Sequence, residues 1–190
     1  MRHPQLLDAR RSRLGVIDLQ ERFLPHIDDV DRVLKNTRRL VQAADAMAIP
    51  KLVTEQSPEK LGPTDPSLAS SLPAAVAKTR FSSAESFGLG TVAGLAADSP
   101  EEADERSQIV LCGIETHICV LQTALDLQAD GWQPYVVSDA CSSREAINHR
   151  AAIARLLHHG IDVVTTEMVL FEWLEDADHT AFRTIRDLVK

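Results

Sequence analysis

The feature that most constrains the fold of this chain is the alternation of short apolar runs, rich in β-branched residues, with longer amphipathic stretches. The runs that indicate strands lie at residues 14–18 (LGVID), 51–54 (KLVT), 74–78 (AAVAK), 108–112 (QIVLC), 133–138 (QPYVVS) and 161–166 (IDVVTT). Apolar residues at helical spacing occupy residues 30–44, 118–129 and 144–158, and a last helix is expected from Met168 onward. Such alternation is typical of repeated βαβ units. We therefore predict an α/β fold, a three-layer sandwich around a six-stranded, mostly parallel sheet.

Capping residues set the expected ends of the helices. Asp28 or Asp29 is the expected N-cap of the first helix, because a short polar side chain accepts hydrogen bonds from the free N–H groups at a helix start. Gly131 and Gly160 follow the two later amphipathic stretches, where glycine is the residue that most readily ends a helix.

Two stretches lack a clear periodic pattern. Residues 54–68 (TEQSPEKLGPTDPSL) are too rich in proline and glycine for regular structure. Residues 81–99 should form a loop and a helix around 89–97, although nearby glycines obscure its start. With 190 residues, 44% of them hydrophobic, the chain can bury roughly 70% of its unfolded surface, and we predict a single domain spanning residues 1–190.

The charge balance disfavours two classes of partner. The formal net charge of −8 and the pI near 5.3 oppose binding to phosphate backbones and to anionic membranes. Aromatic residues make up only 4% of the chain, and these supply the stacking platforms of single-strand binders. We therefore expect no nucleic acid and no membrane among the partners.

The cysteine count indicates the compartment. The three cysteines are an odd number without CxxC spacing, in a chain too large to depend on disulfides. The basic, polar start MRHPQLLDARRSR does not resemble a secretory signal. A reducing, cytoplasmic location is expected.

Three chemically distinct side chains follow predicted strands. Asp18 ends the first strand, Lys78 ends the third, and Cys119 follows the fourth through the segment GIETH; Gln56 comes just after the second. Ligands of open parallel sheets bind outside the carboxyl ends of the strands, so an acid, an amine and a thiol should converge there.

This combination suits covalent acyl chemistry. A thiol becomes a good nucleophile when deprotonated, and both a helix start and a nearby ammonium, here Lys78, favour the thiolate of Cys119. Asp18 would accept the thiol proton and return it to a leaving amine. Taken singly, each residue has an ordinary interpretation: Cys119 as core filler, Asp18 as a cap or ion-pair partner, and Lys78 as a solvated strand end. Cys112 is expected to be structural.

Other familiar sites are disfavoured. His117 stands two residues before Cys119, but neighbouring residues at a helix start point in different directions, so it is not expected to be the catalytic base. No His or Asp cluster with ligand spacing follows the second strand, and neither GxGxxG nor GxxxxGK occurs. We expect no metal and no cofactor.

The motifs VIDLQERF, AKTRFS and GIETHICV resemble those of the isochorismatase-like cysteine hydrolase family, in order and across nearly the whole chain. TEQSPEKLGPT, AKTRFS and DACSSR are similar to its branch of isochorismatase domain-containing proteins 1 and 2. The resemblance implies strand order 3-2-1-4-5-6 and an Asp-Lys-Cys triad of Asp18, Lys78 and Cys119.

The resemblance also implies details of the site. Members typically carry a cis peptide, here between Ile114 and Glu115, and an oxyanion hole made by the amides of Glu115 and Cys119. The implied activity is attack by a Cys119 thiolate on a small amide, ester or related acyl compound, with a covalent intermediate. The expected pocket residues are Gln20, Phe23, Gln56, Phe81, Cys141 and Arg144.

The residues after the second predicted strand differ from those of one branch of the family. Nicotinamidases of this family carry an Asp-x-His metal motif where this chain has TEQS, which disfavours nicotinamide. Arg80 and Arg144 are candidates for binding a substrate carboxylate, with surface ion pairing as the alternative for Arg80 and helix-start packing as the alternative for Arg144.

The rival functions are a non-enzymatic binding or scaffold protein and a thiol redox sensor using Cys119 and Cys141. Because members of the family are commonly dimers or larger, a homo-oligomer is expected; residues 171–174 (FEWL) would either supply an apolar contact or be buried within the single chain.

Overall fold

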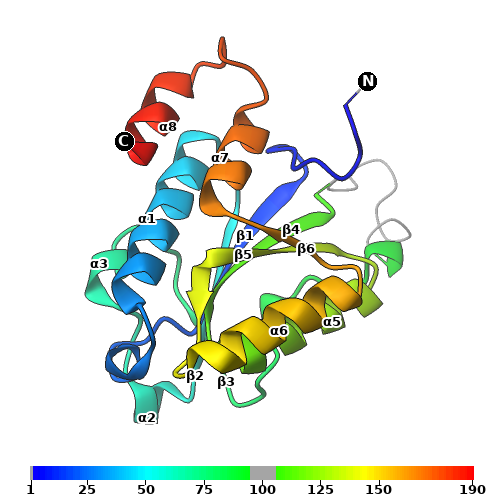
Figure 1. Ribbon diagram of the computed structural model, residues 1–190. Helices are drawn as coiled ribbons and strands as arrows, with labels where there is room; N and C mark the ends of the chain where they lie inside the picture. Colours follow the sequence, from blue (N-terminus) through cyan, green and yellow to red (C-terminus); the bar gives the residue numbers. More distant parts are fainter. Residues whose placement is uncertain (1, 95–105) are drawn as a thin grey trace.

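The computed structural model, which describes residues 2–94 and 106–190, is built around a six-stranded sheet (Figure 1). The strands are β1 (Ser12–Ile17), β2 (Lys51–Gln56), β3 (Val76–Lys78), β4 (Gln108–Ile114), β5 (Gln133–Ser142) and β6 (Asp162–Val164). Their order is β3-β2-β1-β4-β5-β6, and every pairing is parallel. The predicted α/β fold and strand order are confirmed.

Helices cover both faces of the sheet. In Figure 1, α1 (Val30–Ala46), α7 (Thr166–Leu174) and α8 (Phe182–Val189) lie on one side, and α5 (Leu121–Ala129) and α6 (Ala146–His158) on the other. The short elements are η1 (Leu24–His26), α2 (Pro58–Leu61), α3 (Pro66–Ala69), η2 (Glu85–Phe87) and η3 (Thr116–Val120). Of the helices described, none combines the length and apolar character needed to cross a membrane.

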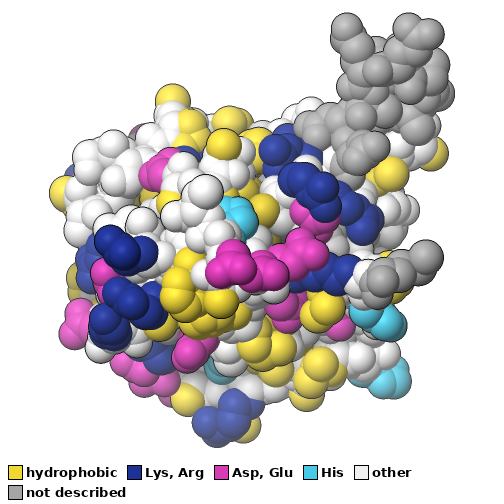
Figure 2. Space-filling view, turned by 90° about the horizontal axis from the view of Figure 1, so that it is seen from above, with side chains coloured by type: hydrophobic (Ala, Val, Ile, Leu, Met, Phe, Trp, Pro, Cys, Tyr) yellow, Lys and Arg dark blue, Asp and Glu magenta, His cyan; other side chains and the backbone are white. Residues whose placement is uncertain are grey.

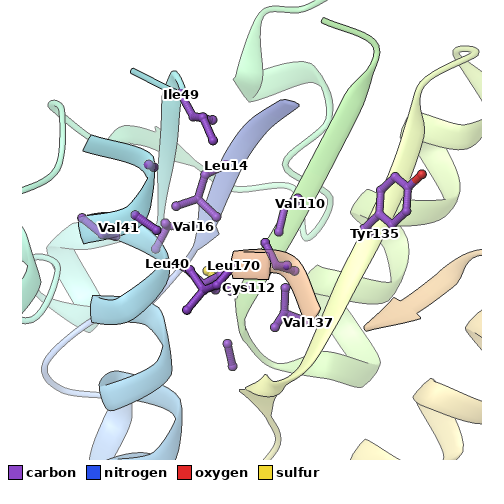
Figure 3. Close-up of a cluster of buried hydrophobic side chains, with 14 of the residues drawn as sticks. Leu14, Val16, Leu40, Val41, Ile49, Val110, Cys112, Tyr135, Val137 and Leu170 are labelled. Carbon is purple, nitrogen blue, oxygen red and sulfur yellow. The ribbon is translucent and has the colours of Figure 1, made fainter. Parts of the chain in front are cut away.

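The sheet separates two apolar cores. One lies beneath α1 and α7 and contains Leu14, Leu40, Val110 and Leu170, which Figure 3 shows closely packed. Cys112 lies in this core with no exposed surface, which confirms its structural interpretation. The second core lies beneath α5 and α6 and includes the side chain of Cys119. Cys119 therefore lies in the α5/α6 layer.

The start of α1 departs from the expected mechanism of capping. Asp29 is the N-cap, as predicted, but it has left-handed backbone angles and its side chain forms no capping hydrogen bond. The carboxylate instead accepts a hydrogen bond from Arg32 Nε at 2.7 Å. The polar residue before the apolar periodicity marked the position of the N-cap. The hydrogen-bond partner of its side chain depended on where Arg32 lies in the folded chain.

The proline-rich stretch 54–68 is more regular than predicted. It contains α2 and α3, and each of these single turns begins with a proline, Pro58 and Pro66. Proline is suited to the first helical position because its φ is already helical and the N–H it lacks would be unpaired there. The expectation that this stretch lacks regular structure is therefore wrong.

Other boundaries also differ from the sequence-based expectation. β5 continues to Ser142, because Cys141 and Ser142 pair with the end of β4 beyond an irregularity. β6 ends at Val164, and α7 begins at Thr166 because Thr165 caps it. The terminal helix is interrupted between α7 and α8. Of the helix expected around 89–97, residues 92–94 are helical and those beyond 94 lie outside the described residues.

A close backbone approach joins β4 to β1 beside the candidate site. Gly113 has φ 125°, and a Cβ there would lie 2.1 Å from the carbonyl oxygen of Ile17. Only glycine fits this contact, because the obstacle is backbone rather than a movable side chain. The contact brings the chain leaving β4 next to Asp18.

We predict that Gly113→Ala lowers the free energy of unfolding by at least about 4 kcal/mol, because backbone must move to admit the methyl group. Gly160→Ala is the matched control. This glycine also has positive φ (74°), but no atom lies within 4 Å of the position that a Cβ would take, so the substitution should lower the free energy of unfolding by about 1–2 kcal/mol. Urea unfolding measures both. Equal losses would show that the close approach does not constrain the fold.

Candidate active site

Asp18, Lys78 and Cys119 meet at the carboxyl ends of the strands. Lys78 Nζ lies 2.7 Å from Asp18 Oδ2, and the thiol of Cys119 is close enough to the Asp18 carboxylate for each to influence the pKa of the other. The three residues are 1%, 6% and 7% exposed respectively. The structure therefore brings together the acid, amine and thiol that the sequence singled out.

Asp18 has an unusual backbone conformation. Its φ is 53°, in the left-handed region, directly after β1 ends at Ile17. Its N–H donates to Thr54 O at 3.1 Å, and its carbonyl accepts from Gln20 N at 2.8 Å. A non-glycine residue held in this region costs about 1–3 kcal/mol and persists only where its surroundings hold it, which is common at functional sites.

The ammonium of Lys78 is surrounded by oxygen atoms. Its acceptors are Asp18 Oδ2 (2.7 Å), Gln56 Oε1 (2.8 Å), Phe81 O (3.1 Å) and Arg80 O (3.2 Å). Only the Asp18 carboxylate carries a charge among these groups. The buried charge of Lys78 is thus compensated by that carboxylate alone and oriented by neutral oxygens.

Cys119 lies in η3, a turn of π-helix between β4 and α5. The turn begins after a cis peptide between Ile114 and Glu115, as the family resemblance implied. Val120 N donates to Glu115 O at 3.2 Å, a bond that spans five residues. The backbone N–H of Glu115 is directed toward the Cys119 sulfur and favours its ionised form. Single π turns within helices occur frequently at functional sites.

The electrostatics favour a protonated thiol in the resting protein. Burial raises the pKa of Cys119 to about 12, and the Asp18 charge acts in the same direction. The Lys78 charge and the Glu115 N–H oppose this increase and are outweighed. The expectation that the surroundings lower this pKa is therefore wrong. Burial also raises the pKa of Asp18, against the effect of Lys78, so the carboxylate is a stronger base than an exposed one.

Two of the expected pocket residues, both glutamines, form an amide pair beneath the triad. Gln20 has no exposed surface; its Oε1 accepts from Gln56 N at 2.8 Å and its Nε2 donates to Gln56 O at 3.1 Å. Gln56 Nε2 donates to Thr79 O at 2.8 Å, which leaves Oε1 facing Lys78. Gln20 thus holds Gln56, and Gln56 orients the ammonium.

Arg144 and Phe23 flank Glu115. The Glu115 carboxylate, 2% exposed, accepts from Arg144 N at 2.8 Å and from Arg144 Nε at 3.1 Å. The guanidinium lies over the Phe23 ring at 5.9 Å from its centroid. Its two η nitrogens form no hydrogen bond within the described part of the chain. The sequence indicated only the amide of Glu115; the role of its carboxylate required the position of Arg144.

The remaining predicted positions lie farther from the chemistry. The Phe81 side chain is 53% exposed, although its carbonyl touches Lys78. Arg80 forms an exposed ion pair with Glu85 at 3.8 Å, in agreement with the surface alternative. Cys141 has no exposed surface and packs in the α5/α6 core, so the structure does not place it in the wall of an open pocket.

The histidines near η3 support the turn. His117 Nδ1 lies 3.0 Å from Ser143 Oγ, and His149 Nδ1 lies 2.9 Å from Thr116 Oγ1. Neither contact involves the sulfur of Cys119. Within residues 2–94 and 106–190, no group of three or more His, Cys, Asp or Glu side chains is arranged to hold a metal ion.

Comparison with known proteins identifies the family. The isochorismatase domain model matches residues 14–168. The chain belongs to the isochorismatase family. It is 38% identical to mouse isochorismatase domain-containing protein 2A, over 94% of this chain and 82% of that protein.

Two solved structures share the fold of this isochorismatase-family protein. MAR1 ribonuclease from Caenorhabditis elegans is 32% identical, with a TM-score of 0.84 over 96% of this chain and 91% of that chain. The Escherichia coli YcaC product, described as an octameric hydrolase of unknown specificity, has a TM-score of 0.75 over 100% of this chain and 97% of that chain. At 21% identity it shows the fold alone.

We predict that Asp18→Asn moves the ultraviolet thiolate titration of Cys119 to lower pH. The substitution removes a charge that raises the pKa of this thiol and leaves the opposing Lys78 charge in place. Subtracting the spectrum of a variant that also carries Cys119→Ala isolates this group. Asp126→Asn, an exposed acid on α5, is the control and should leave the titration unchanged. A titration of Asp18→Asn that moves to higher pH would contradict this electrostatic account.

Proposed function

We propose that this isochorismatase-family protein is a cysteine hydrolase acting on a small amide, ester or related acyl compound. The observation that carries the proposal is a buried carboxylate, Asp18, that is paired with the Lys78 ammonium and interacts with the Cys119 thiol. A carboxylate that touches a thiol is placed to accept its proton as the sulfur attacks.

The first half of the reaction acylates the sulfur. Asp18 takes the Sγ proton of Cys119 while the sulfur forms a bond to the acyl carbon, and the carbonyl electrons move onto oxygen. The tetrahedral intermediate then collapses, the bond to the leaving amine or alcohol breaks, and Asp18 gives that group the proton. A thioester on Cys119 remains.

The second half releases the acid. Water attacks the thioester carbon and transfers its proton to Asp18, which returns that proton to the departing sulfur of Cys119. The oxyanion formed in each half would be stabilised by the backbone N–H groups of Glu115 and Cys119. The Glu115 N–H already faces the sulfur, which supports this assignment.

Lys78 has an electrostatic role in this scheme. Its charge stabilises the ionised form of Asp18, so that the carboxylate is free to accept a proton at neutral pH despite its burial. Because Lys78 Nζ is occupied by four oxygens, it is assigned no contact with the acyl group.

The surroundings favour a small substrate. None of the three proposed catalytic residues is more than 7% exposed, which favours a compact acyl group over a polymer as substrate. The free η nitrogens of Arg144 offer bidentate hydrogen bonds to a substrate carboxylate.

The ribonuclease relative raises RNA as an alternative substrate. The net charge of −8 opposes attraction of a phosphate backbone. Figure 2 shows basic and acidic side chains next to one another on one face, rather than a field of one sign. A deeply buried thiol and carboxylate also suit acyl transfer better than cleavage of a long polyanion.

Two non-hydrolytic alternatives have weaker support. A scaffold protein would not require a buried ion pair in contact with a thiol, since isolated buried charges are costly to maintain. A redox sensor using Cys119 and Cys141 would need the second thiol to be accessible, and Cys141 has no exposed surface.

We further propose that the protein works in the cytoplasm as a homo-oligomer. Its three cysteines are free thiols, which suits a reducing compartment. In the segment 171–174, Trp173 and Leu174 are buried within the chain, so only Phe171 offers a large apolar surface for association.

We predict that Cys119→Ala abolishes hydrolysis in a screen of small amides and activated esters while leaving the fold intact, and that Asp18→Asn slows turnover by at least about a hundredfold. Intact-protein mass spectrometry should detect an acyl adduct on Cys119. Cys112→Ala, which removes a core thiol distant from the triad, should retain turnover. Full activity of a folded Cys119→Ala variant, or cleavage of RNA that survives this substitution, would overturn the proposal.

A further inference from the structure

A series of hydrogen bonds through buried hydroxyl groups connects Asp18, the proposed base, to the backbone of Cys119, the proposed nucleophile. Thr54 Oγ1 lies 2.9 Å from Asp18 Oδ1 and 3.0 Å from Ser83 Oγ. Ser83 N donates to Thr123 Oγ1 at 2.8 Å, and Thr123 Oγ1 donates to Cys119 O at 2.6 Å. Thr54, Ser83 and Thr123 all have no exposed surface.

Proton counting fixes the direction of each bond. Thr54 has a single hydroxyl proton, which it donates to Asp18, so Ser83 must donate its own proton to Thr54. Thr123 accepts from the Ser83 N–H and donates to the Cys119 carbonyl. With Asp18 ionised, every hydroxyl proton in the chain therefore has one acceptor.

The two Asp18 oxygens thus have different partners. Oδ2 is held by Lys78 at 2.7 Å and Oδ1 by Thr54 at 2.9 Å, so the carboxylate cannot rotate without losing one of these bonds. The other end of the chain holds the carbonyl of Cys119, in the turn that carries the sulfur. The base and the nucleophile are therefore fixed relative to each other through the same set of bonds.

We propose that Thr54, supported by Ser83, is a positioning residue that orients the Asp18 carboxylate toward the Cys119 thiol and stabilises its ionised form. The inference rests on the proposed hydrolase function. A hydrogen bond to the ionised form of a carboxylate lowers its pKa, so Thr54 offsets part of the increase that burial causes.

Another buried threonine provides the comparison. Thr37 in α1 also has no exposed surface, but its hydroxyl forms no hydrogen bond to nitrogen or oxygen in the described residues. Replacing Thr37 by valine therefore removes a buried hydroxyl that interacts with the core thiol of Cys112 and not with Asp18. The two threonines share size, shape and burial, and they differ in their contact with the site.

The test compares Thr54→Val, Thr54→Ser and the control Thr37→Val in the full chain, with p-nitrophenyl acetate as the probe ester. Thr54→Val should lower kcat/KM by at least about tenfold and move the acid limb of its pH profile upward, because Asp18 becomes harder to ionise. Thr54→Ser keeps the hydroxyl and should stay within about threefold of the parent. Thr37→Val should change neither the rate nor the acid limb.

A measurement without turnover separates this inference from the proposed function. Carbon-13 NMR titration of the Asp18 carboxyl should show a higher pKa in Thr54→Val than in the parent or in Thr37→Val. An unchanged Asp18 titration and an unmoved acid limb, with loss of thermal stability alone, would overturn the inference and leave the hydrolase proposal intact. Turnover that survives Cys119→Ala would instead contradict the hydrolase proposal itself.

Discussion

The site depends on one buried ion pair, between Lys78 and Asp18. Their side chains are 2% exposed and their charged atoms lie 2.7 Å apart. Removing two charges from water costs free energy unless they are paired and hydrogen-bonded. Here Thr54 donates a further hydrogen bond to Asp18, and Gln56 and two backbone carbonyls accept hydrogen bonds from Lys78. The strand order β3-β2-β1 makes the pair possible, because it sets Lys78 and Asp18 on either side of the β2 residues that support them.

The nucleophile reaches this pair through the chain leaving β4. Gly113 permits β4 to end against the backbone of β1, and η3 then presents the Cys119 thiol to Asp18. The same burial that makes Asp18 a stronger base keeps the thiol protonated, so the proposed nucleophile forms by proton transfer during attack. A resting thiolate, exposed to oxidation, is thereby avoided.

Much of this arrangement can be predicted from the sequence. The rest depends on contacts between residues that are far apart along the chain. The short apolar runs that alternate with amphipathic stretches predicted the sheet and its helices, and the polar residues after the strands marked Asp18, Lys78 and Cys119. Thr54 gave no signal because a β-branched residue in a strand is ordinarily packing. The protonation of Cys119 was mispredicted because helix-start and ammonium effects can be inferred from sequence, whereas burial depends on the folded chain. Cys141 was misplaced because β5 extends farther than its apolar run.

The protonation state of Cys119 in the unliganded protein tests the account most directly. Thiolates absorb in the ultraviolet where thiols do not, so the difference spectrum between the parent and Cys119→Ala isolates this group. The account predicts no thiolate absorbance from Cys119 at neutral pH and its appearance only under strongly alkaline conditions. Thiolate absorbance at neutral pH that disappears in Cys119→Ala would contradict it.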